Sequence, residues 1–167
     1  MRKICVSILA AISLSMSFAQ PPTDTEVFQH GMFDLLKEFK GLDNDSYKKH
    51  FVTYDEFKAF SESHELQEYN QPMLDDMNSG DYYKEINKYY IKIKYAAAKR
   101  GVDWEKIYFL DFIYKTTSGG LKGELFFSYN DKTYSVKVGA YLLDSGYKVS
   151  SIKKFKDYNK KFLFKLN

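Results

Sequence analysis

The sequence predicts a single α+β domain in which N-terminal amphipathic helices pack on a curled, four-stranded antiparallel sheet at the C-terminal end. Apolar residues recur at helical spacing over about the first hundred residues, and strand-like runs fill the remainder. Short gaps rich in Gly, Asn, Asp and Ser separate these runs, which is typical of antiparallel neighbours. Helices followed by strands, rather than alternating with them, indicate the α+β class.

The first helix is predicted over residues 24–40. Thr23 and Glu26 form a capping-box pattern, in which each side chain bonds a backbone N–H of the other residue. Phe28, Met32 and Leu35 then follow at the spacing of one helix face. Residues 41–52 are polar and rich in turn formers, so they are predicted to be a loop.

A second capping box, Thr53 with Glu56, opens a helix that is predicted to run to about His64. Further helix, broken near Pro72, is expected over residues 66–77. The longest helix is predicted over residues 81–100, with Asp81 as its N-cap and Gly101 closing it. It is long enough to lie across four strands.

The sheet is predicted over residues 107–116, 121–130, 133–143 and 147–155. The third run alternates clearly, with Tyr134 and Val136 on one face and Ser135 on the other. Gly123 and Gly139 lie inside strands, where glycine often marks a bulge or bend. Such bends would curl the sheet around a helix and leave a hollow.

The first nineteen residues are predicted to be a secretory signal peptide. Arg2 and Lys3 precede an apolar run at 4–14, and Ser17-Phe18-Ala19 resembles a cleavage site. The run is too short for a transmembrane segment. We therefore expect cleavage after Ala19, export to the periplasm or outside the cell, and one domain over residues 20–167.

The order of these elements resembles the nuclear transport factor 2-like superfamily, a cystatin-like cone of helices in a curled antiparallel sheet. The resemblance covers most of the mature chain. It lies in the first helix, in Phe51-Val52-Thr53-Tyr54-Asp55-Glu56-Phe57, and in strands containing Gly123-Glu124-Leu125-Phe126-Phe127 and Gly146-Tyr147-Lys148-Val149-Ser150-Ser151-Ile152. The chain departs from the pattern because no clear strand separates its early helices. The resemblance implies one of the roles found in that superfamily, whose members are small-molecule enzymes, ligand-binding modules, dimerisation modules or secreted proteins.

No motif in the sequence predicts a metal or a cofactor. The only cysteine, Cys5, falls within the predicted signal peptide, so the mature chain lacks disulfide and thiolate chemistry. His30, His50 and His64 have no metal-ligand spacing. Asp43 and Asp45 begin no calcium loop, because the required Gly and Glu are missing at the sixth and twelfth positions.

Asp111 is the candidate for catalysis. Strand alternation places it on one face with Ile107, Phe109 and Ile113. If that face is interior, loss of solvent would raise its pKa, as a general acid or base requires. The alternative is a carboxylate at the rim of the sheet that contacts water or a backbone donor.

The leading functional prediction is a non-enzymatic, exported binding module. Aromatic residues make up 18% of the chain, which indicates heavy aromatic packing, an aromatic pocket, or both. We expect a small apolar ligand or a protein partner at an aromatic hollow or at the open sheet face. The candidate binding residues are Tyr108, Phe112, Tyr114, Phe127, Tyr129, Tyr134 and Tyr141.

Acidic and basic residues are distributed unevenly between the two halves of the chain. Residues 20–105 hold 11 basic and 17 acidic side chains, whereas residues 106–167 hold 12 and 5. A basic sheet could meet an anionic partner, or these charges could be solvated faces. The predicted export argues against a nucleic-acid partner, although basic and aromatic residues alternate after residue 153.

Further alternatives stay open at this point. One is an exported immunity or inhibitor protein that masks a toxin or hydrolase. Another is a small lyase or isomerase that uses Asp111 in a cone pocket. A third alternative is a homodimer in which two copies associate through the sheet.

Overall fold

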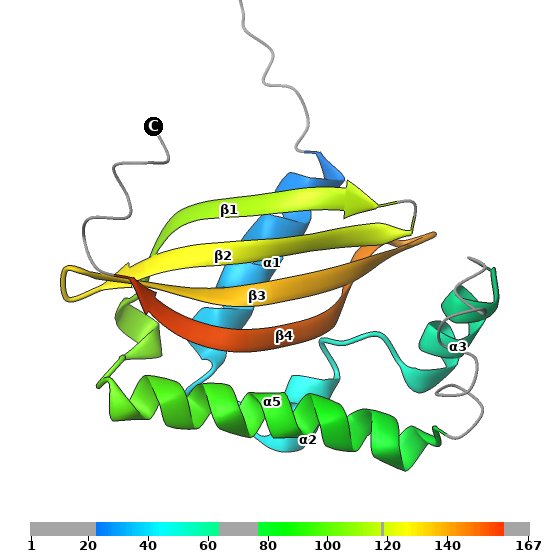
Figure 1. Ribbon diagram of the computed structural model, residues 1–167, viewed down its shortest axis with the longest axis horizontal. Coiled ribbons are helices and arrows are strands. Elements are labelled where there is room, and N and C mark those ends of the chain that lie inside the picture. Colours follow the sequence, from blue (N-terminus) through cyan, green and yellow to red (C-terminus); the bar gives the residue numbers. More distant parts are fainter. Residues whose placement is uncertain (1–22, 64–76, 118, 159–167) are drawn as a thin grey trace, which may run out of the picture.

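The computed structural model describes residues 23–63, 77–117 and 119–158, and it confirms the α+β class (Figure 1). The predicted signal peptide, most of the predicted helix at 66–77 and the chain after residue 158 lie outside the described residues. The elements in order are α1 (Asp24–Glu38), α2 (Asn44–Lys48), α3 (Tyr54–Ser63), α5 (Ser79–Lys99), the 3-10 turn η1 (Trp104–Lys106), β1 (Tyr108–Thr117), β2 (Gly120–Tyr129), β3 (Lys132–Leu143) and β4 (Gly146–Tyr158).

The sheet is an antiparallel meander in the order β1-β2-β3-β4. A two-residue turn joins β2 to β3, and both of its residues, Asn130 and Asp131, have positive φ, 47° and 58°. That geometry suits the right-handed twist of a tight hairpin. The predicted strands are confirmed to within a few residues, with β4 reaching Tyr158 rather than Phe155.

The sheet is curled and unclosed. Register shifts against β4 fall between Ser135 and Lys137 and between Gly139 and Ala140 of β3, so β4 bulges twice. The predicted bend at Gly139 therefore coincides with a bulge. Gly123 has a different role, because a Cβ atom there would lie 2.6 Å from the ring of Phe112.

Both capping boxes are confirmed. The Thr23 N–H donates to Glu26 Oε2 at 2.7 Å, and the Glu26 N–H donates to Thr23 Oγ1 at 3.3 Å. The equivalent Thr53 and Glu56 distances are 2.7 and 3.2 Å. Each pair satisfies two N–H groups that the helix itself leaves without acceptors.

Two local predictions were wrong. The N-cap of α5 is Asn78, whose Oδ1 accepts a hydrogen bond from the N–H of Asp81 at 3.0 Å. The predicted loop at 41–52 contains the short helix α2, which is capped by Asp43. Tyr47 of α2 is buried and stacks on Tyr90 of α5, with 4.4 Å between ring centroids. That packing stabilises a helix that its turn-forming residues do not predict.

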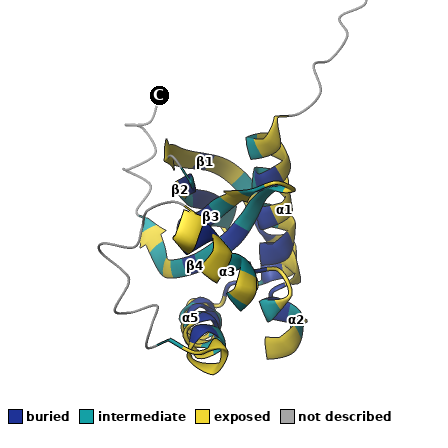
Figure 2. Ribbon diagram, turned by 90° about the vertical axis from the view of Figure 1, so that its right-hand side faces the viewer, coloured by how far each residue is buried: buried dark blue, intermediate teal, exposed yellow. Residues whose placement is uncertain are grey.

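The core lies between α1 and one face of the sheet, which we call the inner face. Phe28 of α1 approaches Phe112 of β1, and Phe39 connects through Trp104 to Phe127 of β2. The opposite, outer face is covered at one end by α3, where Phe60 stacks on Tyr141 at 4.1 Å. Helix α5 runs along β4, and β1 lies at the other edge (Figures 1 and 2).

Candidate interaction surface

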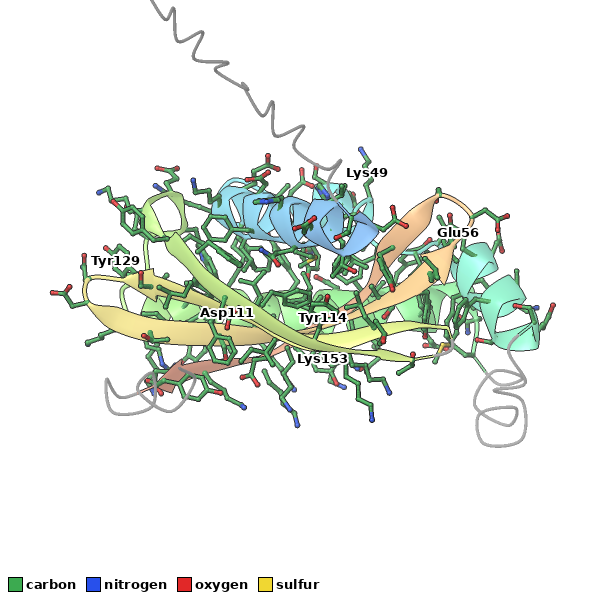
Figure 3. The ribbon with its side chains drawn as sticks, turned by 90° about the horizontal axis from the view of Figure 1, so that it is seen from above. Lys49, Glu56, Asp111, Tyr114, Tyr129 and Lys153 are labelled. Carbon is green, nitrogen blue, oxygen red and sulfur yellow. The ribbon has the colours of Figure 1, made fainter. Side chains whose placement is uncertain are left out.

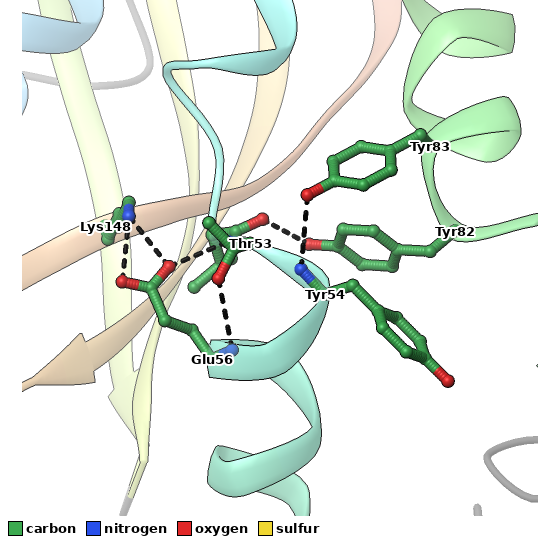
Figure 4. Close-up of polar contacts among 7 residues, drawn as sticks. Thr53, Tyr54, Glu56, Tyr82, Tyr83 and Lys148 are labelled. Carbon is green, nitrogen blue, oxygen red and sulfur yellow. Dashed lines mark hydrogen bonds and ion pairs between the residues drawn. The ribbon is translucent and has the colours of Figure 1, made fainter. Parts of the chain in front are cut away.

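The β4 edge of the sheet is covered by the rest of the fold. The Val52 N–H donates to the Val149 carbonyl at 2.8 Å, and Phe51 forms a parallel bridge with Val149. The Tyr82 hydroxyl of α5 donates to the Val52 carbonyl at 2.8 Å. Lys148 of β4 pairs with Glu56 of α3 at 2.7 Å (Figure 4). These bonds attach helical elements to the edge strand.

The β1 edge has no such cover within the described residues, where β2 is the only strand that pairs with β1. Tyr108 is 72% exposed, Ile113 43% and Tyr114 45%, and Leu110 is also exposed. Most of β1 is accordingly coloured as exposed in Figure 2. Backbone N–H and C=O groups along an edge strand are templates for pairing with another chain.

A bulge divides β1 into two parts. Phe109 pairs with Phe127, whereas Asp111 pairs with Phe126, so Leu110 is the extra residue. From Asp111 the pairing continues without another register shift to Thr117. The second part of β1 is therefore a regular edge.

The bulge also changes which residues share a face. Asp111 and Ile113 lie on the outer face, opposite Phe126 and Glu124, while Phe109 lies opposite Phe127 of the inner face. The prediction that Asp111 shares a face with Phe109 was therefore wrong. Asp111 is exposed, and its Oδ1 accepts a hydrogen bond from the Phe112 N–H at 2.7 Å. The interior environment on which the catalytic prediction depended is absent at this residue.

The seven predicted aromatic residues separate into three groups. Phe112, Phe127 and Tyr134 are buried in the core, and Tyr141 lies beneath α3, where burial raises its pKa. Tyr129 is half-buried. Only Tyr108 and Tyr114 are exposed, and both belong to β1. Figure 3 shows Asp111 and Tyr114 along this strand.

Lysines dominate the uncovered part of the outer face. Lys115 of β1 pairs directly with Lys122 of β2, and Lys137 of β3 pairs directly with Lys153 of β4. Like charges that face each other across neighbouring strands are unfavourable. Lys153 also lies 4.9 Å from the ring centroid of Tyr89, on the side of the sheet away from α1 (Figure 3).

Glu124 is the main counter-charge on this face. Its Oε1 accepts hydrogen bonds from Ser135 at 2.6 Å, Tyr158 at 2.7 Å and Lys156 at 3.2 Å. Partial burial raises the pKa of this carboxyl, but the three donors outweigh burial and hold the pKa below its usual range. Glu124 therefore links β2, β3 and β4, whereas Lys115 lies beyond this network.

A groove of about 290 Å³ lies between α1 and the β3–β4 turn. Its apolar lining includes Phe28, Met32 and Val149, and His50 and Lys148 contribute polar atoms. None of the seven predicted aromatic residues lines it. Its volume is at the lower end of the range for small-molecule sites.

Within residues 23–63, 77–117 and 119–158, no group of three His, Cys, Asp or Glu side chains is placed to hold a metal. No described helix is long and apolar enough to cross a membrane. No protein-family model, curated protein or solved structure matches the chain. The resemblance to the nuclear transport factor 2-like superfamily stays a prediction.

Proposed function

We propose that the protein is an exported, non-enzymatic binding module that binds a protein partner as an added strand at β1. The observation that carries this proposal is the contrast between the two sheet edges. Helices and a bridging segment cover β4, while β1 presents exposed apolar side chains and is paired, within the described residues, with β2 alone.

Strand addition would use the backbone for affinity and the side chains for selectivity. An incoming strand would bond the N–H and C=O groups of β1 that point away from β2. Ile113 would contact it on the outer face and Tyr114 on the inner face, since successive side chains of a strand point to opposite faces. Tyr and Ile both favour cross-strand packing.

The other predicted functions have less support. For a small apolar ligand, the groove beside α1 is open and near the lower volume limit for such sites. A lyase or isomerase would need Asp111 in a water-excluded environment, and this side chain is exposed. An immunity or inhibitor protein would be consistent with strand addition if its target supplied the strand.

Site-specific photo-crosslinking in the producing cells would test the proposal. A photoreactive side chain would replace Tyr108 on β1 and, as the matched control, Tyr95 on α5. These residues are 72% and 70% exposed, so both reach solvent to the same extent. We expect a discrete crosslinked protein species from the Tyr108 position, with the attached peptide mapping to one extended segment, and only diffuse products from Tyr95.

Equal, diffuse products from both positions would contradict the proposal. An unmodified monomer at both positions would do the same. The identity of the attached peptide separates partners, because a peptide from this chain and a peptide from another protein differ in mass.

A further inference from the structure

We infer that the strand that β1 accepts is β1 of a second copy, in an antiparallel register centred on Ile113. This inference rests on the proposed strand addition and names its partner. It is carried by the order of charged and apolar residues along the regular part of β1, Asp111-Phe112-Ile113-Tyr114-Lys115. That order is self-complementary when the strand is reversed.

The register follows from the faces of the strand. Directly opposed residues in an antiparallel pair point to the same face, so the outer-face residues Asp111, Ile113 and Lys115 must oppose one another. When Ile113 faces its own copy on the two-fold axis, Asp111 of each chain faces Lys115 of the other. Moving the register by two residues in either direction separates these charges, and moving it by one residue places side chains on the wrong faces.

The charges of β1 favour this pairing. Among the described residues, neither Asp111 nor Lys115 forms an ion pair within 4.0 Å. The Asp111 Oδ1 accepts a hydrogen bond from the Phe112 N–H, and in the proposed pairing it would exchange this bond for one from Lys115 of the second copy. Lys115 instead faces Lys122 across the β1–β2 pair. Asp111 from a second copy would lie on the other side of Lys115 and offset that repulsion. Lys115 would repel a strand that carries a basic residue at this position and attract one that carries an acidic residue, so the same side chain supplies selectivity.

Aromatic packing on the inner face agrees with the same register. Phe112 and Tyr114 stack within one chain, with ring centroids 5.3 Å apart. In the proposed pairing Phe112 of each copy faces Tyr114 of the other, so the two stacks lie side by side as one cluster of four rings. Aromatic pairs across neighbouring strands are favourable.

The fold also explains why pairing would stop at two chains. The two-fold contact uses the same edge of both copies, which leaves the two β4 edges at the ends of an eight-stranded sheet. Those edges are covered by the Phe51 bridge and by α5. A closed dimer, rather than a growing fibre, is the expected product.

The test is a charge-exchange experiment on the mature protein, with mass measured by sedimentation equilibrium. The variants are Asp111→Lys, Lys115→Asp and the double exchange, with Asp144→Lys in the exposed β3–β4 turn as the control. Circular dichroism would verify that each variant folds. We expect the wild type and the control to dimerise equally, and each single variant to dimerise about tenfold more weakly or worse, because it places two like-charged pairs at the contact.

Mixing the two single variants gives the decisive result. One chain then carries two lysines at the contact and the other carries two aspartates, so the mixed dimer has both pairs complementary. We expect this mixed dimer, and the double-exchange homodimer, to recover the wild-type affinity. Rescue of this kind cannot come from a general effect on folding.

Two outcomes would overturn the inference. One is a wild type that stays monomeric up to millimolar concentration, and the other is a dimer that the charge exchanges leave unchanged. In either case a crosslink from the Tyr108 position to a different protein would still support strand addition at β1. Loss of that crosslink as well would overturn the proposed function.

Discussion

The two edges of the sheet belong to strands of similar length, yet the fold treats them differently. At β4, a backbone bond from Val52, the Tyr82 hydroxyl and the Lys148–Glu56 pair attach helical segments to the strand. At β1, exposed Tyr108, Ile113 and Tyr114 border an edge that no described element covers. Within the described residues, more contacts between the sheet and the rest of the fold therefore lie at β4 than at β1, and the proposed function rests on this difference.

The largest expected change in the free energy of unfolding comes from replacing isoleucine with alanine, and this substitution can be compared at the two edges. Ile152→Ala in β4 removes a side chain that is 1% exposed, and should lower the free energy of unfolding by about 2–5 kcal/mol. Ile113→Ala in β1 should cost less than about 1 kcal/mol in dilute protein, because this side chain is 43% exposed. Urea unfolding at submicromolar concentration would measure both. Equal losses would show that β1 is as firmly packed as β4.

Tyr82→Phe should have a smaller effect. It leaves the buried Val52 carbonyl without the hydroxyl donor at the covered edge, which costs about 1–3 kcal/mol. Tyr95→Phe is the control, because its hydroxyl is on an exposed side chain of the same helix. Urea unfolding of both variants measures the difference. A loss from Tyr95→Phe as large as that from Tyr82→Phe would contradict the proposed role of the Val52 contact.

Glu124→Gln should change the pH dependence of stability by the smallest amount. The folded-state pKa of Glu124 is lowered, so its contribution is complete above the unfolded-state pKa of about 4.3 and is lost as the pH falls through the folded-state pKa. The wild type should therefore be more stable than Glu124→Gln at neutral pH, and the difference should disappear in acid. Urea unfolding at several pH values between 7 and 3 would measure it. A difference that does not vary with pH would contradict the role of the ionised carboxylate.

Much of the fold could be predicted from local sequence patterns. Alternation and turn residues located the four strands, and Thr23 with Glu26 and Thr53 with Glu56 located two helix starts. Helix α2 could not be predicted in this way, since Asn44, Asp45 and Ser46 favour turns and its stability comes from the packing of Tyr47 on distant aromatic rings.

The candidate interaction surface was less predictable than the fold. Strict alternation cannot reveal a bulge, so the extra residue at Leu110 moved Asp111 away from the face of Phe109. Local patterns also cannot show which edge a distant helix covers. Tyr108 and Tyr114 were therefore indistinguishable from Phe127 and Tyr134 as candidates, although only the first two are exposed.

Residue-resolved amide hydrogen exchange at low and high protein concentration would directly measure whether the β1 edge pairs with a second copy. If two copies pair at β1, the N–H groups of residues 113–115 that point away from β2 should gain protection as the concentration rises, whereas the Phe112 N–H already bonds Asp111 within the chain. The Val52 N–H, which already bonds Val149, should keep the same protection throughout. Protection of β1 that does not change with concentration, or a gain confined to another surface, would contradict pairing at the β1 edge.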